Sequence, residues 1–330
     1  MERLDRFMGR ANAAYYANHD PFRDFTTSPE ISQVFGEILG LWAAVTWELI
    51  GRPDPVVLVE LGPGRGTLMA DALRAVGAVA PAFRAALRLH LVERSPRLRE
   101  AQARQLPGAV WHESLEGVPE GPLLVLANEF LDALPIRQFV RREGVWVERY
   151  VEGRRFVEVV APAPPPIPLP RGEGGSEGVV VEVNEGAVRI SGDLAARFFL
   201  HPGAALFLDY GPERSAAGDS LQALRDGKAA DPLAASGSAD LTAHVDFGAF
   251  GGAAVDAGAA VWGPVPQGVF LTRLGLFRRT DRLARGQPPA RAGALIEAAR
   301  RLAEPNRMGR LFKAMALSSP GLLSPPGFET

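Results

Sequence analysis

The stretch that determines the fold reads VVLVELGPGRGT and covers residues 56–67. Its first four residues form an unbroken aliphatic run, which is typical of a parallel strand buried on both faces. Glu60 follows this run, and glycines at positions 62, 64 and 66 then alternate through a loop. A helix through Met69, Leu73 and Val76 comes next. This order of strand, glycine loop and helix indicates an α/β protein with a ligand at the exit of the strand.

The alternating glycines indicate that bare main chain approaches a small molecule closely. Amide groups at the beginning of a helix can also bind an anionic or zwitterionic group. A dinucleotide fingerprint would place glycine where Thr67 stands, and a P-loop would continue with lysine and a hydroxyl residue. The alternative is an ordinary tight turn, which needs glycine but hardly three in alternation. We therefore predict a cofactor site that contains Glu60, Gly62, Pro63, Gly64, Gly66 and Thr67.

Further strands are predicted from apolar runs on the C-terminal side of this loop. They cover residues 87–92, 123–127, 204–208, 259–265 and 311–317. A helix is predicted over residues 246–258. Strands separated by helical stretches argue for a doubly wound α/β sheet.

Glu93 stands directly after the predicted strand over residues 87–92. An acid at the carboxyl end of a neighbouring strand can accept hydrogen bonds from both hydroxyls of a ribose. Such an acid is usually a solvated loop charge when it stands alone. In this order behind the glycine loop, however, Glu93 is predicted to anchor a ribose, and the two features together predict a bound nucleoside.

Polar residues also follow the strand over residues 123–127, in the sequence NEFLDALP of residues 128–135. This is the edge at which open α/β sheets bind ligands. The amide of Asn128 is assigned to the cofactor site, and the carboxylates of Glu129 and Asp132 could orient an amine or guanidinium and take its proton. Alternatively, both acids only cap the following turn. The sequence favours function for Glu129 and leaves Asp132 open between the two interpretations.

The N-terminal segment reads DFTTSPE at residues 24–30 and is rich in hydroxyl and acidic groups. A helix is expected to begin here, either with Ser28 as cap before Pro29 or with Thr27 as cap before Glu30. Apolar residues at helical spacing continue this helix to Leu49. The segment is either a simple cap or a lid over the cofactor. The lid hypothesis adds Thr27 to the cofactor site.

Residues 139–190 interrupt the alternation of strands and helices. Alternating apolar residues over 145–149 and 155–159 predict a hairpin that turns near Gly153, and residues 161–178 are dense in proline and glycine. The interruption is interpreted as an inserted β-rich flap. We accordingly divide the chain into an N-terminal helical lid or substrate region (1–54), a first part of the catalytic domain (55–138), the flap (139–190) and the remainder (191–330). A nucleophile-elbow match at residues 174–178 lacks the required strand and helix and is discarded.

His244 lies between two acids in the sequence DLTAHVDF, residues 240–247. It could act as a general base, although a loop histidine beside a helix cap is more often structural. The other histidines, His19, His90, His112 and His201, show no ligand spacing, so no metal site is expected.

Composition limits the remaining classes of protein. The chain of 330 residues has a net charge of −2 and no long run of one sign, so no nucleic-acid partner is expected. The absence of cysteine excludes disulfides and is compatible with a reducing cytoplasm. No signal peptide is visible, and the apolar stretch at residues 38–50 is too short to span a bilayer. We expect a soluble, cytoplasmic protein, and a homodimer stays open.

Four linked motifs together closely resemble the MidA family, the relatives of the arginine methyltransferase that assembles respiratory complex I. They are DFTTSPEISQ (24–33), ELGPGRGTL (60–68), NEFLDALP (128–135) and DLTAHVDF (240–247). The resemblance runs in order from about residue 15 to about residue 319.

The resemblance implies a class I, Rossmann-like methyltransferase with a seven-stranded sheet and an inserted substrate-facing region. It also implies methyl transfer from S-adenosyl-L-methionine to arginine on a complex I subunit. The family's glycine motif, which lines the cofactor, matches residues 62–66, and its ribose acid matches Glu93. Its motif next to the methyl donor matches Asn128 and Glu129.

Two departures from the family pattern concern the lid and the substrate contacts. Only Arg23 separates Pro21-Phe22 from Asp24, where relatives have a longer glycine-containing loop, and Asn184-Glu185 stands where relatives tend to carry Ser-Pro.

The expected activity is protein-arginine methylation with Glu129 aligning the guanidinium and Asp132 assisting. The alternatives are a non-catalytic assembly factor that binds the cofactor and, with Thr67 against it, a nicotinamide-dependent oxidoreductase.

Overall fold

The computed structural model describes residues 1–19, 26–162, 176–234 and 236–329. The chain forms two units, each built from segments that are discontinuous in the sequence. The small unit takes residues 1–25, 130–191 and 210–253, and the large unit takes 26–129, 192–209 and 254–330. Two helices, α7 (Glu185–Leu200) and α8 (Phe247–Asp256), continue from one unit into the other. The boundaries expected after residues 54, 138 and 190 stay a prediction.

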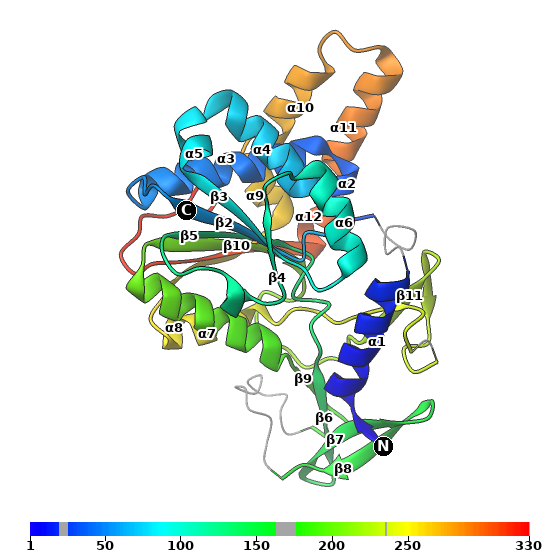
Figure 1. Cartoon of the computed structure of the whole chain (residues 1–330). Coiled ribbons are helices and arrows are strands. Elements are labelled where there is room, and N and C mark those ends of the chain that lie inside the picture. Colours follow the sequence, from blue (N-terminus) through cyan, green and yellow to red (C-terminus); the bar gives the residue numbers. More distant parts are fainter. Residues whose placement is uncertain (20–25, 163–175, 235, 330) are drawn as a thin grey trace. The chain divides into compact units, whose positions relative to one another are not determined.

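A seven-stranded sheet forms the centre of the large unit (Figure 1). Its order is β14 (Ala260–Pro266), β15 (Phe312–Ser318), β10 (Gly203–Tyr210), β5 (Leu123–Asn128), β2 (Val56–Leu61), β3 (Leu87–Val92) and β4 (Val110–His112). The five strands from β10 to β4 pair in parallel, whereas β14 and β15 are antiparallel. Every residue of β2 and β5 is buried, which explains their continuous apolar runs. The predicted seven-stranded, mostly parallel sheet is confirmed.

The order of the strands reverses between β2 and β5. The chain builds β2, β3 and β4 outward in one direction and then returns to place β5 on the other side of β2. Leu61 at the end of β2 pairs with both Val92 of β3 and Ala127 of β5, so the three strands end at the same edge. Open α/β sheets bind ligands at the carboxyl ends of the strands at such a reversal. The glycine loop and Asn128-Glu129 flank this point.

Helices cover both faces of the sheet (Figure 1). On one face, α3 (Gln33–Leu49) packs on α4 (Thr67–Val79) with their backbones in close contact. A Cβ atom on Gly36 would lie 2.7 Å from the Leu68 carbonyl oxygen, and one on Gly40 would lie 2.7 Å from Ala72 Cα. The two glycines of α3 are therefore required by the packing. Other helices of the large unit are α5 (Pro81–Ala86), α6 (Pro96–Gln105), α9 (Gln267–Arg273), α10 (Leu276–Ala284), α11 (Pro289–Ala303) and α12 (Met308–Leu311).

The single helix predicted to run from residue 28 to residue 49 is wrong, because the structure breaks it at Ser32. A short helix, α2 (Ser28–Ile31), ends there, and Ser32 adopts an extended backbone. The Ser32 hydroxyl oxygen accepts a hydrogen bond of 3.2 Å from the Val34 amide and caps α3. Thr27 occupies the cap position of α2 but makes no side-chain cap hydrogen bond. Serine competes well for such amide donors, and this favours the break.

The small unit contains two antiparallel sheets and helix α1 (Leu4–Asn18). The first sheet has the strands β1 (Glu2–Arg3), β6 (Arg137–Arg142), β7 (Val145–Glu152), β8 (Arg155–Val160) and β9 (Val180–Val183). The second has β11 (Gln222–Arg225), β12 (Lys228–Ala230) and β13 (Asp240–Thr242). The hairpin predicted near Gly153 is confirmed, since Glu152 pairs with Arg155 and Gly153 has a φ of 64°.

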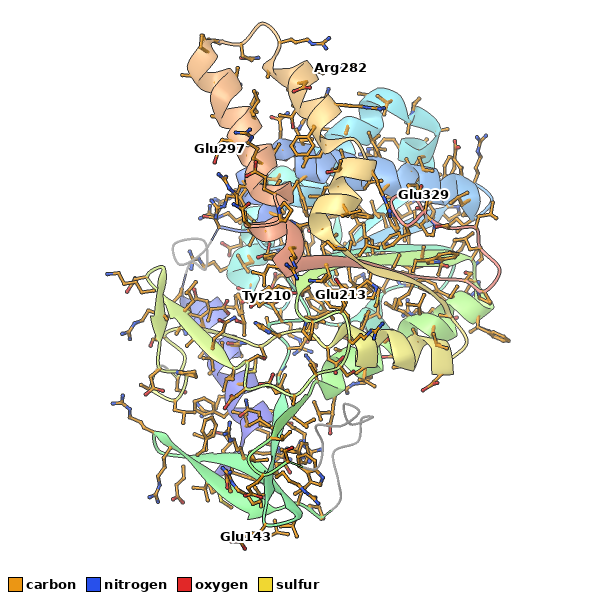
Figure 2. The ribbon with its side chains drawn as sticks, turned by 180° about the vertical axis from the view of Figure 1, so that it is seen from behind. Glu143, Tyr210, Glu213, Arg282, Glu297 and Glu329 are labelled. Carbon is orange, nitrogen blue, oxygen red and sulfur yellow. The ribbon has the colours of Figure 1, made fainter. Side chains whose placement is uncertain are left out.

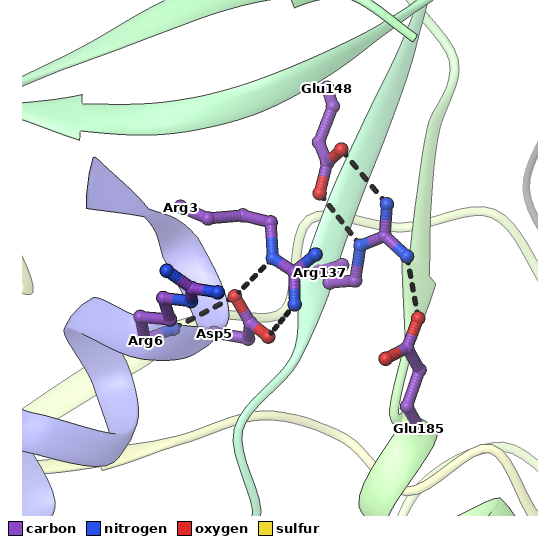
Figure 3. A network of polar contacts seen from close by, with 6 residues as sticks. All are labelled: Arg3, Asp5, Arg6, Arg137, Glu148 and Glu185. Atoms are coloured by element: carbon purple, nitrogen blue, oxygen red, sulfur yellow. Dashed lines mark hydrogen bonds and ion pairs between the residues drawn. The ribbon is translucent and has the colours of Figure 1, made fainter. Parts of the chain in front are cut away.

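An arginine-centred network fastens the first sheet of the small unit (Figure 3). Arg137 binds both carboxylate oxygens of Glu148, at 2.7 and 2.9 Å, and a carboxylate oxygen of Glu185 at 2.5 Å. These carboxylates raise the pKa of Arg137. A bidentate pair of this kind fixes both partners in one geometry. It joins β6 and β7 to the beginning of α7.

Several features of the sequence lie outside the described residues. These are Asp24 and Phe25 of the first motif, the short loop at Arg23, and the glycines at 174 and 175 of the discarded elbow. In the part of the chain that the structure describes, no helix is both long and apolar enough to cross a membrane.

Candidate active site

The glycine loop joins β2 to α4 in a conformation that side chains disfavour. Gly62, Gly64 and Gly66 have φ values of 64°, 55° and 84°. The Gly62 amide donates to the Val92 carbonyl at 3.0 Å, and the Gly66 amide donates to the Pro63 carbonyl at 2.7 Å. Residues other than glycine rarely adopt this left-handed region. The loop therefore holds a bare main chain at the edge where the strand order reverses.

Glu93 is held next to this loop by donors from α6. One carboxylate oxygen accepts a hydrogen bond of 2.8 Å from the Ser95 amide, and the other accepts one of 3.3 Å from the side chain of Gln102. Burial raises the pKa of Glu93, and these donors oppose the increase. A fixed carboxylate one strand away from the loop has the position required of a ribose anchor.

Gln102 is a site residue that the sequence interpretation missed. Its fully buried side-chain amide donates to the Gly64 carbonyl at 2.7 Å as well as to Glu93. Its side-chain oxygen accepts a hydrogen bond of 2.8 Å from the Trp111 indole. A signal was present in the sequence, because Gln102 lies between Leu98 and Leu106 at four-residue spacing on the buried face of α6. A polar residue on such a stripe requires internal partners.

Two buried polar atoms at the site have no hydrogen-bond partner among the described residues. They are Glu60 Oε2 at the end of β2 and Asn128 Oδ1 at the end of β5. Burial raises the pKa of Glu60 to about 8. Buried polar atoms without partners are rare in native structures and commonly mark a missing ligand or water. Together with the glycine loop, whose main chain carries no side chain at three positions, they fit a polar ligand.

Glu129 has a strained backbone and an oriented carboxylate. Its φ is 50°, and its amide donates to the Leu208 carbonyl at 2.8 Å. Its Oε1 atom accepts hydrogen bonds of 3.0 Å from the Ser28 amide and 3.0 Å from the Asn128 side chain. Burial raises its pKa. Positive φ in a residue other than glycine or asparagine is uncommon and concentrates at functional positions.

Helix α2 contacts both sides of the site. Its Ser28 amide binds Glu129, and its Glu30 carboxylate accepts a hydrogen bond of 2.6 Å from the Thr67 hydroxyl at the beginning of α4. Thr27 is half-buried, and its carbonyl accepts from the amides of Glu30 and Ile31. The segment before α3 therefore belongs to the site, although the structure gives no side-chain hydrogen bond for Thr27.

The structure thus brings most predicted site residues to one sheet edge of the large unit: Thr27, Glu60, Gly62, Pro63, Gly64, Gly66, Thr67, Glu93, Asn128 and Glu129. Asp132 and His244 belong to the small unit. Asp132 is buried, and its carbonyl accepts a hydrogen bond of 3.0 Å from the Ala243 amide. The roles of these two residues stay predictions.

His244 is fixed within the small unit by its own main chain. Its amide donates to the Ser220 hydroxyl at 2.8 Å, and that hydroxyl in turn donates to the Glu182 carboxylate. The imidazole lies edge-on to the Tyr210 ring, with the centroids 5.7 Å apart. Burial lowers the pKa of His244, which favours the neutral imidazole that a general base requires.

Asn184, at one of the two departures from the family pattern, acts in the structure as the cap of α7. Its side-chain oxygen accepts a hydrogen bond of 2.8 Å from the Ala187 amide. Its side-chain nitrogen donates to the carbonyls of Leu131 and Leu134, at 3.1 and 3.4 Å. Asn184 therefore holds the chain that follows Glu129.

Among the described residues, no group of three or more histidine, aspartate or glutamate side chains could hold a metal ion.

The reversed strand order, the bare glycine loop and the carboxylate beside it define a nucleoside-binding α/β protein of the class I methyltransferase type. Residues 38–265 match the family described as "Putative S-adenosyl-L-methionine-dependent methyltransferase". The chain belongs to this family.

Named relatives and solved structures agree with this assignment. A Drosophila melanogaster protein named "Protein arginine methyltransferase NDUFAF7 homolog, mitochondrial" is 36% identical over 98% of this chain and 82% of its own length. The Homo sapiens protein "Protein arginine methyltransferase NDUFAF7, mitochondrial" is 34% identical over 89% of this chain and 73% of its own length. A crystal structure from Burkholderia thailandensis bound to S-adenosyl-homocysteine is 28% identical, has a TM-score of 0.79, and covers 98% of this chain and 89% of that chain. The protein is an S-adenosyl-L-methionine-dependent methyltransferase.

Proposed function

We propose that this methyltransferase modifies an arginine side chain of a protein, specifically a subunit of respiratory complex I, and so supports the assembly of that complex. The observation that carries the proposal is the oriented Glu129 carboxylate, which lies at the end of β5 beside the glycine loop. The names of the curated relatives support arginine of a protein as the acceptor. The complex I subunit rests on the resemblance of the four motifs.

The residues that would hold the cofactor fit its chemistry. Glu93 would bind the two ribose hydroxyls, and the glycine loop would leave room for the adenosyl group against the main chain. Glu60 Oε2 and Asn128 Oδ1 are buried acceptors that suit polar donors of the ligand. Bound S-adenosyl-L-methionine supplies an electrophilic methyl group on a sulfonium.

Glu129 is assigned to the acceptor side of the reaction. The donors from Ser28 and Asn128 fix one carboxylate oxygen and thereby the plane of the whole group. A carboxylate in a fixed plane binds guanidinium through paired N–H donors and prevents its rotation. The same carboxylate takes the proton that the attacking nitrogen loses. Positioning of this kind, in a water-poor site, accounts for most of the acceleration expected in a direct displacement.

The remaining predictions concern the surroundings of the site. The segment at Thr27 and α2 is proposed to act as a lid, and the inserted β-rich segment as a flap that faces the protein substrate. Asp132 and His244 are proposed to assist in proton transfer. A homodimer and a cytoplasmic, bacterial location stay predictions.

The test compares Glu129→Gln with Glu129→Asp. Glu129→Gln keeps an acceptor for the Ser28 amide but loses the negative charge, so we expect calorimetric titration with S-adenosyl-homocysteine to give an affinity within about threefold of the wild type. Methyl incorporation into complex I subunits, measured by mass spectrometry, is expected to fall by about 100-fold or more. Glu129→Asp is expected to retain part of the activity. Full activity of the glutamine variant would remove Glu129 from the mechanism, and methylation of a residue other than arginine would refute the proposed substrate.

A further inference from the structure

Positive charge is concentrated in one segment of the large unit. Residues 273–310 contain ten arginines against Asp281, Glu297 and Glu304, which gives this segment a formal charge of +7. The whole chain has a net charge of −2, so the rest of the sequence carries −9. The segment covers α10 and α11, which Figure 1 shows as an adjacent pair of helices joined by a short loop. This separation of charge within one chain requires a local explanation.

Neighbouring arginines in α10 and at its C-terminal end have different surroundings. Arg279 forms an ion pair of 2.6 Å with the buried carboxylate of Glu37 and thereby fastens α10 to α3. Arg278, Arg282 and Arg285 are exposed, and no ion pair reaches them from any described residue. Figure 2 labels Arg282 on α10 and Glu297 on α11. Arg279 is thus explained by the fold, whereas its three neighbours are not.

Arg278 and Arg282 lie four residues apart on one face of α10, and Arg285 follows as the residue that ends the helix, with an extended backbone. We call these three residues the stripe. Like charges at this spacing destabilise a helix by a few tenths of a kcal/mol per pair. The opposite face of α10 carries the buried Leu276 and Thr280, which pack inward. Arg278 and Arg282 therefore repel each other, and none of the three side chains forms an ion pair with a described residue.

Helix α11, the second helix of this pair, lies close to the candidate active site. Helix α11 contacts α2, and the Ser28 amide of α2 binds the Glu129 carboxylate. The positive charge of the exposed Arg301, in the last turn of α11, lowers the pKa of Glu129 against the effect of burial. A molecule that binds along this pair of helices would therefore reach toward Glu129.

We propose that the stripe of Arg278, Arg282 and Arg285 binds an acidic segment of the protein substrate. This inference rests on the proposed function, because it takes the acceptor to be an arginine of a protein. A positively charged segment repels an isolated arginine, and carboxylates near the target arginine reverse this repulsion. Guanidinium groups match carboxylates through two parallel N–H donors. The stripe would thus select arginines that lie in an acidic sequence.

Two other partners of basic surfaces fit less well. A helix that binds a membrane surface needs a broad free apolar face, but on α10 only Phe277 is an exposed large apolar side chain, and Leu276 is fully buried. Nucleic acid presents a long array of phosphates, and the −9 carried by the rest of the chain would oppose extended contact. A short acidic peptide requires only the stripe itself.

The test uses fluorescence anisotropy with two labelled peptides. One carries a central arginine flanked by glutamates, and the other carries glutamines in place of the glutamates. The wild-type protein is expected to bind the glutamate peptide about tenfold more tightly at low salt, with the difference lost at high salt. The triple variant Arg278→Gln, Arg282→Gln and Arg285→Gln is expected to lose about tenfold in affinity for the glutamate peptide.

A matched control removes the same charge elsewhere. Arg84, Arg104 and Arg189 are exposed helical arginines outside the stripe, and their triple glutamine variant is expected to stay within about twofold of the wild type. Titration with S-adenosyl-homocysteine, expected to be unchanged in both triple variants, shows that they are folded. The same titration separates the two claims. Failure of the wild type to bind S-adenosyl-homocysteine would count against methyl transfer at this site, whereas it would not change the result of the peptide measurement.

Three outcomes would overturn the inference. The first is equal affinity of the wild type for the two peptides. The second is an equal loss of affinity for the glutamate peptide in the stripe variant and in the control variant. The third is a stripe variant that keeps the glutamate peptide but loses binding to phosphatidylglycerol vesicles or to duplex DNA, which would assign the stripe to a membrane or to nucleic acid.

Discussion

The side chain of Gln102 donates a hydrogen bond of 2.7 Å to the carbonyl oxygen of Gly64, in the middle of the glycine loop. The same nitrogen lies 3.3 Å from Glu93 Oε2. A single buried amide therefore connects the loop after β2 with the carboxylate after β3. Gln102 is a positioning residue, since it acts on the ligand through these two neighbours.

Replacing Gln102 by leucine is expected to weaken S-adenosyl-homocysteine binding by about 5- to 100-fold, because the Gly64 carbonyl and the Trp111 indole each lose a partner. Calorimetry measures the change. Gln105→Ala is the control, because Gln105 is exposed and donates only to the Arg65 carbonyl at 3.1 Å.

A purely structural role for Gln102 can be separated by the choice of ligand. If Gln102 orients Glu93, removal of one ribose hydroxyl from the ligand should weaken binding to the wild type more than to Gln102→Leu. An equal effect of that hydroxyl in both proteins would show that Gln102 does not act through Glu93.

Glycine substitutions in and beyond the loop are expected to have opposite effects. Gly64→Val places a branched side chain at a φ of 55°, which costs about 1–2 kcal/mol and blocks close approach of a ligand. S-adenosyl-homocysteine binding should be abolished. Gly77→Ala lies in α4 with open space around its Cβ and should stabilise the protein by about 0.5–1 kcal/mol without affecting binding. Thermal unfolding and calorimetry measure both effects, and tight binding by Gly64→Val would place the ligand elsewhere.

Glu60 makes the ligand-free protein sensitive to pH. Burial raises its pKa to about 8, from an ordinary value of 4.5. Between these values the folded protein keeps a proton that the unfolded chain releases, so the stability from this group falls as pH rises toward 8. We expect Glu60→Gln to raise the free energy of unfolding at about pH 8 by about 2 kcal/mol and to weaken S-adenosyl-homocysteine binding. Identical pH profiles of the melting temperature in both proteins would contradict this.

A pair of histidines on β3 and β4 should act in the opposite direction. His90 Nδ1 and His112 Nε2 lie 2.8 Å apart, with the rings stacked. Burial lowers the pKa of both, and nearby Arg99 and Arg197 further lower that of His112. The unfolded chain therefore takes up protons first, and the stability present above about pH 6.5 is lost as pH falls. His112→Gln should show a smaller fall in melting temperature between about pH 7.5 and about pH 5. A fall in melting temperature as large as that of the wild type would show that the histidine pair does not cause the loss of stability at low pH.

The sheet, and the position of most candidate site residues at one of its edges, could be predicted from the sequence because the relevant signals are local. Continuous apolar runs identify β2 and β5, since burial on both faces leaves a polar residue only near the carboxyl end of each strand, at Glu60 and Asn128. Alternating glycines identify the loop, since every second residue from 62 to 66 is left-handed and therefore favours glycine. The positions of Glu93 and Asn128 follow from the carboxyl ends of their strands.

Other features depend on contacts between distant segments and could not be predicted from local patterns. The break at Ser32 interrupts a continuous apolar periodicity, because the serine hydroxyl competes for the Val34 amide. The bond from the Ser28 amide to Glu129 joins residues that lie far apart in the sequence. The small unit is likewise assembled from three separate segments of the sequence, and no local pattern predicts that these segments come together.

The four residues of α2 have a thermodynamic consequence. Through Ser28 they hold the carboxylate assigned to the acceptor, and through Glu30 they hold the hydroxyl at the first residue of the helix that follows the glycine loop. Occupancy of either half of the site that shifts α2 must therefore change the affinity of the other half, and linkage requires the two changes to be equal. Methyl donor and acceptor would thus bind cooperatively, with α2 as the element that links them.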